Sequence, residues 1–236
     1  MEIIKAKCRE QLSSVDLEFV ATVLGHNKNE ISVNELLQDT EMRDIMLDEQ
    51  ILLQVIYQYP ECAHISDRLF YYIILRHVLQ GFGIDHRAVT DYMAELLTIY
   101  MPKYLESSSI NRLHPMAYLY EMLNMQDHDL YSFHAHSNVG SYTLFLTGVV
   151  PEEIRFKKRL HTCPKLEYFE AMGAKHYIKA GKLDEVNKER LSSVYKFIAR
   201  NYRKLRLALN VMAEHHIFNR YFSMEMETGK KASQWL

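Results

Sequence analysis

An apolar stripe in the C-terminal third of the chain constrains the fold more than any other feature. Over 191–212, apolar residues recur every three or four positions, at Leu191, Tyr195, Ile198, Tyr202, Leu205, Leu209 and Met212. Side chains at this spacing share one face of an α-helix, whereas a half-buried strand would alternate every second residue. The stripe therefore predicts a long amphipathic helix, with a break near Asn201.

The rest of the sequence also favours helices. Its 236 residues include only 8 Gly and 5 Pro, fewer than a strand-rich fold with many tight turns needs. No segment alternates apolar and polar residues over the length of a strand. We therefore expect an all-α fold, a multi-helical globular bundle of about eight to ten helices.

Capping residues indicate where several of these helices begin and end. Ser13 or Ser14 is expected to start the first helix, and Ser66 the most apolar one. Gly81 is expected to close that apolar helix in the left-handed conformation. Asp85 is then the expected cap of the next helix.

Charge is unevenly distributed along the chain. Residues 1–150 hold 10 Lys and Arg against 20 Asp and Glu, a net −10, and residues 151–236 hold 18 against 10, a net +8. We expect one all-helical domain over 1–224, with an acidic half (1–150) and a basic half (151–224), followed by a flexible tail over 225–236. Such asymmetry could join the two halves of one chain, two copies of the chain, or the basic half and an acidic partner. The favoured interpretation is that the charges are scattered over solvated helix faces.

The sequence predicts a cytoplasmic protein that does not contact the membrane. It has three widely spaced cysteines and no Cys-x-x-Cys pair, so neither a disulfide framework nor a zinc knuckle is indicated. The first ten residues contain several charges and lack the apolar core of a secretion signal. The longest apolar run, 69–75, is much shorter than the roughly 20 residues that span a membrane, and it predicts a buried helix.

The first candidate site is the segment 131–148, which reads YSFHAHSNVGSYTLFLTG. His134, His136 and Tyr142 could line a polar cavity for a small ligand. Two histidines two positions apart on a helix project about 200° from each other, so they could bind one metal ion only if the helix begins later and 134–136 is extended. The small residues around Gly140 favour close helix packing instead, and we expect no metal and no cofactor.

The abundance of tyrosine leaves the cavity hypothesis open. Tyr72, Tyr118, Tyr142 and Tyr168 could surround a partly polar cavity. The favoured interpretation is that the tyrosine rings fill the core and that their hydroxyls reach the surface.

Motifs for catalysis are sparse, and the sequence favours a role without enzymatic activity. Glu61 and His64 form a single Glu-x-x-His, whereas helical di-iron proteins need two copies and two further glutamates. The GFG at 81–83 is expected to be a turn, because it lacks the spacing of a phosphate-binding loop. The cations around Cys163 would lower its thiol pKa, which makes it the cysteine most worth testing for reactivity. A structural or merely exposed thiol is the favoured interpretation.

Two basic strips, 155–165 and 196–206, form a second candidate site. Their basic residues are Arg155, Lys157, Lys158, Arg159, Lys196, Arg200, Arg203, Lys204 and Arg206. Clustered cations can contact nucleic-acid phosphates, because binding there releases counterions. The sequence pI of about 6.6 and the lack of a recognised nucleic-acid module make a protein partner the favoured alternative.

Two segments, HSNVGSYTLFLTGVVPE and LEYFEAMGAKHY, resemble a pattern in uncharacterised bacterial helical proteins. The resemblance covers roughly 84–215. It implies a bacterial, cytoplasmic protein, and it implies neither an activity nor a functional residue.

Three functional hypotheses follow. The leading one is a helical interaction or regulatory protein that self-associates or docks a protein partner through its charge asymmetry. The alternative is a helical enzyme or small-ligand binder with a polar cavity near His134, His136 and Tyr142. The third is nucleic-acid binding through the two basic strips.

Overall fold

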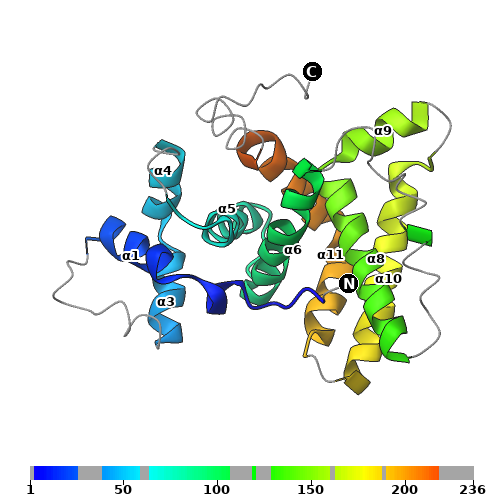
Figure 1. Cartoon of the computed structure of the whole chain (residues 1–236), viewed down its shortest axis with the longest axis horizontal. Coiled ribbons are helices and arrows are strands. Elements are labelled where there is room, and N and C mark those ends of the chain that lie inside the picture. The colour runs from blue at the N-terminus through cyan, green and yellow to red at the C-terminus, as the bar shows by residue number, and fades with distance from the viewer. Residues whose placement is uncertain are drawn as a thin grey trace.

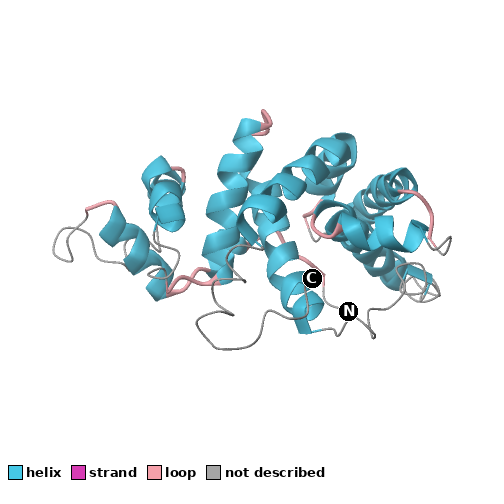
Figure 2. Ribbon diagram, turned by 90° about the horizontal axis from the view of Figure 1, so that it is seen from above, coloured by secondary structure: helices cyan, strands magenta, loops and turns pink. Residues whose placement is uncertain are grey.

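The computed structural model describes residues 3–25, 39–58, 64–106, 119–120, 129–159, 163–187 and 190–217. Within these ranges every regular element is helical, as the colours of Figure 2 show. In chain order, the elements are η1 (Cys8–Gln11), α1 (Ser14–Val23), α3 (Thr40–Leu47), α4 (Gln50–Gln58), α5 (Asp67–Gly81), α6 (Arg87–Glu106), α8 (Asp129–Gly148), α9 (Pro151–Arg159), α10 (Leu166–Asn187), α11 (Ser192–Met212) and η2 (Ala213–Ile217). The prediction of an all-α, multi-helical fold is therefore confirmed.

The helices form three groups along the long axis of the molecule (Figure 1). α1, α3 and α4 lie at one end, α5 and α6 pack together in the middle, and α8, α9 and α10 lie at the other end. α11 joins the last two groups, because it packs against α5, α6, α8 and α10. The border between the acidic and basic halves at residue 150 is not a structural border, since α8 of the acidic half packs on α10 of the basic half.

Some expectations are not tested by this architecture. Glu61, Tyr118 and the tail at 225–236 lie outside the described residues. A single domain over 1–224 stays a prediction. Among the helices that the structure describes, none is both long and apolar enough to cross a membrane.

Two of the expected helix starts are confirmed, and one carboxylate connects them. The Ser13 hydroxyl accepts a hydrogen bond from the Asp16 amide at 3.1 Å, and Asp16 Oδ2 accepts one from the Ser13 amide at 2.9 Å. The Ser66 hydroxyl caps α5 by accepting from the Leu69 amide at 3.2 Å. Asp16 Oδ1 also accepts from the Ser66 amide at 2.7 Å, so the buried carboxylate ties the start of α1 to the start of α5.

The expected connection between α5 and α6 is wrong in two details. Gly81 is still helical, and Gly83 takes the left-handed conformation with φ +69°. His86 rather than Asp85 caps α6, because its Nδ1 accepts from the Val89 amide at 3.3 Å. The GFG segment does end in a turn, as predicted.

The two apolar patterns of the sequence form the core. The side chains of 69–75 are all buried, so α5 runs through the interior as its composition predicts. The α11 stripe is buried along its whole length. α11 breaks its helical geometry at Asn201 (φ −109°, ψ 15°), where the side-chain amide donates to the Phe197 carbonyl at 3.0 Å. The predicted break is therefore confirmed.

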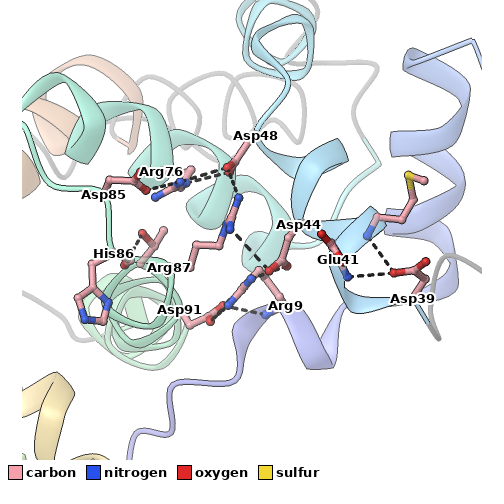
Figure 3. Close-up of polar contacts among 12 residues, drawn as sticks. Arg9, Asp39, Glu41, Asp44, Asp48, Arg76, Asp85, His86, Arg87 and Asp91 are labelled. Carbon is pink, nitrogen blue, oxygen red and sulfur yellow. Dashed lines mark hydrogen bonds and ion pairs between the residues drawn. The ribbon is translucent and has the colours of Figure 1, made fainter.

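A network of arginines and aspartates joins α3, α5 and α6 (Figure 3). Arg76 of α5 is 2% exposed and donates to Asp48 at 2.8 and 3.1 Å. Asp85 pairs with Arg76 at 2.5 Å, and Arg87 of α6 donates to Asp48 at 2.6 Å. Asp48 therefore bridges two cations from different helices.

Arg9 extends this network to the N-terminal segment. Its guanidinium binds both carboxylate oxygens of Asp91, the shortest contact being 2.8 Å, and it also pairs with Asp44 (Figure 3). The Arg9 guanidinium carbon lies 5.6 Å from the centre of the Tyr72 ring. Some of the acidic residues that give 1–150 its net negative charge therefore form ion pairs with arginines inside the fold.

Close packing of α8 on α11 gives a prediction for one glycine. A Cβ on Gly148 would lie 2.8 Å from Leu209 Cβ, whereas a Cβ on Gly81 would have no neighbour within 4 Å. Both glycines end a helix. Gly148→Ala should lower the free energy of unfolding by about 1–3 kcal/mol through overpacking. Gly81→Ala, the matched control, should raise it by up to about 1 kcal/mol, because alanine loses less backbone entropy. Equal changes in the free energy of unfolding for the two variants, measured by urea denaturation, would contradict this packing.

The arginine network gives a second prediction. Asp48→Ala should lower the free energy of unfolding by about 3 kcal/mol, because it deprives the buried Arg76 of its main partner. Glu152→Ala is the control, since Glu152 is exposed and pairs with the exposed Arg155 of the same helix. Its effect should be below about 0.5 kcal/mol. A loss for Asp48→Ala as small as the control's would show that the network does not stabilise the fold.

Candidate functional site: the buried seam and the outer face of α11

Small residues on α8 let α10 and α11 approach it closely. A Cβ on Gly140 would lie 3.0 Å from the Tyr177 ring of α10. A Cβ on Gly173 of α10 would overlap the side chains of Tyr202 and Thr143. The expectation that the small residues around Gly140 serve close packing is therefore confirmed. We call the contact region of α8, α10 and α11 the buried seam.

Tyrosine and serine hydroxyls fill part of this seam. The Tyr92 hydroxyl of α6 lies 2.7 Å from Ser141 Oγ, and the Tyr195 hydroxyl lies 2.8 Å from Ser137 Oγ. Ser141 Oγ donates to the Ser137 carbonyl at 2.7 Å, so Tyr92 must donate to Ser141. Tyr177 approaches Ser141 Oγ at 3.5 Å. We call these five residues the tyrosine–serine cluster.

Of the four tyrosines named for the cavity, Tyr72 contradicts the prediction that their hydroxyls reach the surface, because its hydroxyl is buried. The hydroxyls of Tyr92 and Tyr195 do not reach the surface but form buried hydrogen bonds. Of the tyrosines proposed for a cavity, Tyr72 is fully buried and Tyr168 is 48% exposed. Burial raises the pKa of the Tyr92 and Tyr195 phenols, so both stay neutral at physiological pH. The cluster therefore contains no phenolate that could act as a base.

Two histidines meet at the edge of the seam. The rings of His136 on α8 and His176 on α10 stand edge to face, with centroids 4.7 Å apart and planes at 89°. The two residues are 6% and 7% exposed. Neither Nδ1 atom has a hydrogen-bond partner among the described residues. The pair therefore consists of two closely packed imidazoles whose Nδ1 atoms are buried.

Burial keeps this histidine pair neutral. It lowers the pKa of His136 to about 4, and the charge of Lys179 lowers it further. The pKa of His176 is lowered to about 4 by burial first, then by His136 and by the charges of Lys179 and Lys175. Both rings are therefore uncharged near neutral pH, where their nitrogens can donate or accept hydrogen bonds.

The three residues proposed from 131–148 do not converge. His136 faces His176, whereas the His134 ring packs edge to face against Phe133 at 5.8 Å. The half-buried Tyr142 lies beside Tyr100, with ring centroids 6.1 Å apart. Helix geometry separates the two histidines as expected. The partner of His136 lies 40 positions further along the chain, and no spacing rule connects them.

The described residues do not form a metal centre. No group of three or more His, Cys, Asp or Glu side chains in this part of the chain could hold a metal ion. The cations of Lys175 and Lys179 near the histidine pair would also repel one. What the histidine pair can do chemically is exchange hydrogen bonds or protons.

A reactive Cys163 thiol is not supported by its surroundings. Burial raises the pKa of its thiol, and the opposing effect of the Lys157 charge is smaller. The thiol is therefore protonated at neutral pH, and a thiolate nucleophile is not favoured there. The cations counted in the sequence act less strongly than desolvation.

The first basic strip lies on α9, where acidic residues of the same helix accompany it. Arg155 pairs with Glu152, and Lys157 pairs with Glu153 at 3.7 Å. Lys158 and Arg159 are exposed. Figure 1 shows α9 at the upper end of α8, while α11 begins at the lower end of α10.

The second basic strip lies on α11 and contains one residue that is not on the surface. Arg206 is 8% exposed, pairs with Glu170 of α10 and donates to Asn210 at 2.7 Å. Its assignment to the basic surface is therefore wrong, because its guanidinium connects α11 to α10. Lys196 is partly buried.

The remaining cations of α11 belong to a mixed stripe. Arg200, Arg203 and Lys204 are exposed, and Leu207 (38% exposed) and Val211 (36% exposed) lie on the same helix face as Arg203 and Lys204. Arg200 stands just before the break at Asn201. We call these five exposed residues the basic–apolar stripe. The sequence indicates the cations of the stripe but not its apolar end, because the exposed Leu207 lies between the buried Leu205 and Leu209.

Comparison with known proteins gives no match. No family model, curated protein or solved structure is detectably similar to the chain. The resemblance to uncharacterised bacterial helical proteins therefore stays an expectation from the sequence. The seam and the basic–apolar stripe are the features of the structure that bear on function.

The histidine pair predicts how stability depends on pH. Because the pKa values of the folded protein are about 4 and the ordinary value is 6.5, the unfolded chain takes up protons at a higher pH. The stability is present in full above pH 6.5 and falls as the pH is lowered toward 4. Replacing both histidines by Phe should reduce the loss between pH 7 and 4.5 by about 5 kcal/mol, roughly 2.4 kcal/mol for each ring. The measurement is urea denaturation at each pH, with His134→Phe as the control. A double variant that keeps the full wild-type loss would contradict the role of the pair.

Proposed function

We propose that this chain is a helical interaction protein that docks an acidic, partly apolar protein surface on the basic–apolar stripe of α11. The observation that carries the proposal is the stripe itself. After the break at Asn201, it places Arg203, Lys204 and two exposed aliphatic side chains on one face of α11, and the opposite face is core. The exposed Arg200 adds a third cation just before the break. Cations orient a partner and increase its association rate, and aliphatic groups add affinity when they are desolvated.

The contacts that fix α11 against α8 and α10 support this role. Tyr202 and Leu205 on the inner face of α11 are buried, and Arg206 binds Glu170. Asn210 donates to the carbonyls of Thr147 and Gly148 at 3.2 and 2.6 Å, which fixes the C-terminal part of α11 on α8. A rigid helix face loses little conformational entropy when a partner binds.

The seam supports the ligand-binding alternative less well. In the tyrosine–serine cluster, Tyr92 and Tyr195 already bond to serines within the protein. Their hydrogen-bonding groups are therefore used for packing rather than directed to a ligand. The histidine pair keeps free Nδ1 atoms, but the described residues place no nucleophile or third ligand beside them.

Nucleic-acid binding is the other use of the same cations. A site for phosphates would gain from a continuous run of cations, whereas the stripe ends in Leu207 and Val211. The α9 cations also lie beside the carboxylates of Glu152 and Glu153. Both features favour an acidic protein surface over a phosphate backbone.

The proposal is tested with synthetic probes. One probe is a helical peptide with Glu and Leu on one face, the second is the same peptide with Ser in place of Leu, and the third is a 20-base-pair DNA duplex. We expect the Glu–Leu peptide to bind most tightly. Arg203→Glu with Lys204→Glu, and separately Leu207→Ser with Val211→Ser, should each weaken it at least tenfold, about 1.4 kcal/mol.

The matched control for the charge reversal is Lys165→Glu with Lys182→Glu, which reverses two exposed cations outside the stripe. It should leave the affinity within about twofold, apart from a small long-range effect of charge. Fluorescence anisotropy supplies the dissociation constants. Equal binding of the Glu–Leu and Glu–Ser peptides, or tighter binding of DNA than of either peptide, would overturn the proposal.

A further inference from the structure

A second exposed stripe, of opposite charge, lies on α3. Glu41 and Glu49 are exposed, and between them Met42 and Ile45 are 40% and 52% exposed. Glu41, Met42 and Ile45 lie on α3, whereas Glu49 follows the turn that ends this helix and stands just before α4. We call these four residues the acidic–apolar stripe.

The two stripes match in chemistry. One combines carboxylates with two aliphatic side chains, and the other combines cations with two aliphatic side chains. At about 1.5 Å per residue, 41–45 extends about 6 Å along α3 and 203–211 extends about 12 Å along α11. The two stripes can therefore contact each other through opposite charges and through aliphatic side chains.

One molecule cannot bring its own two stripes together. α3 lies at one end of the molecule, and α5 and α6 lie between it and α11 (Figure 1). The inner face of α3 is also engaged, because Asp44 pairs with Arg9 and Asp48 pairs with Arg76 (Figure 3). Those carboxylates hold α3 in place and leave Glu41 and Glu49 on the outside.

We propose that the partner of the basic–apolar stripe is the acidic–apolar stripe of a second copy of this chain. This inference rests on the proposed function and names its partner. The contact is heterologous, since each chain uses α11 toward one neighbour and α3 toward the next. Two short helix faces bury less than a standard interface of roughly 1,600 Å², so the association is weak and concentration-dependent. Its charge complementarity makes it sensitive to salt.

Charge reversal on each face tests the pairing. Variant one is Glu41→Lys with Glu49→Lys, and variant two is Arg203→Glu with Lys204→Glu. Asp39 is left unchanged, because it caps α3 by accepting from the Glu41 and Met42 amides. In sedimentation velocity, the wild type should self-associate at about 100 μM and low salt and dissociate at 0.5 M salt. Each variant alone should associate at least tenfold more weakly.

Recombination of the variants separates this contact from a non-specific one. In a mixture, the Lys-bearing α3 of variant one meets the Glu-bearing α11 of variant two, and the two unchanged faces also match. The mixture should therefore regain association, as should a single chain that carries all four substitutions. Thermal melts followed by circular dichroism check that every variant is folded.

The outcomes are distinct. A wild type that stays monomeric, or a variant one that associates like the wild type, overturns the pairing of α3 with α11. Failure of the mixture to recover association also overturns it. If the chain is monomeric but the Glu–Leu peptide still binds α11, only the choice of a second copy falls. If the peptide also fails to bind, the proposed function falls with it.

Discussion

The close approach of α10 and α11 to α8 is the constraint on which the rest of the C-terminal group depends. Glycines at 140, 148 and 173 leave no space for a Cβ, so the rings and aliphatic side chains of neighbouring helices lie directly against the backbone. Packing this close buries tyrosine hydroxyls, and a buried hydroxyl without a partner is costly. Ser137 and Ser141 supply the partners from α8 itself. The unusual content of small and hydroxylated residues in α8 thus serves both shape and hydrogen bonding.

Charge has two roles in this molecule. In the N-terminal half, Arg9 and Arg76 are held inside by aspartates of other segments, so these charges connect the helices of that half to one another. On α11, Arg206 has the same role toward α10, whereas Arg203 and Lys204 face outward. Net charge per half does not distinguish these roles. Only the burial of each residue does.

The sequence predicts local features of the fold better than contacts between distant segments. The α11 stripe, the break at Asn201 and the starts at Ser13 and Ser66 follow from periodicity and capping, which act within a few residues. The pairing of His136 with His176 and of Arg76 with Asp48 joins residues far apart in the chain, and no local rule encodes it. The cap at His86 was missed for a related reason. Asp85 has the better capping propensity, but Arg76 holds its carboxylate.

The tyrosine–serine cluster also has a consequence in alkaline solution. Burial raises the pKa of the phenols of Tyr92, Tyr177 and Tyr195 above their ordinary value, so the unfolded chain releases these protons first. Strong alkali therefore lowers the free energy of unfolding, because these phenols ionise more readily in the unfolded chain. Ionised phenol absorbs at a longer wavelength than the neutral ring. The change in ultraviolet absorbance of these buried tyrosines therefore reports the separation of α6, α10 and α11 from α8 without an added label.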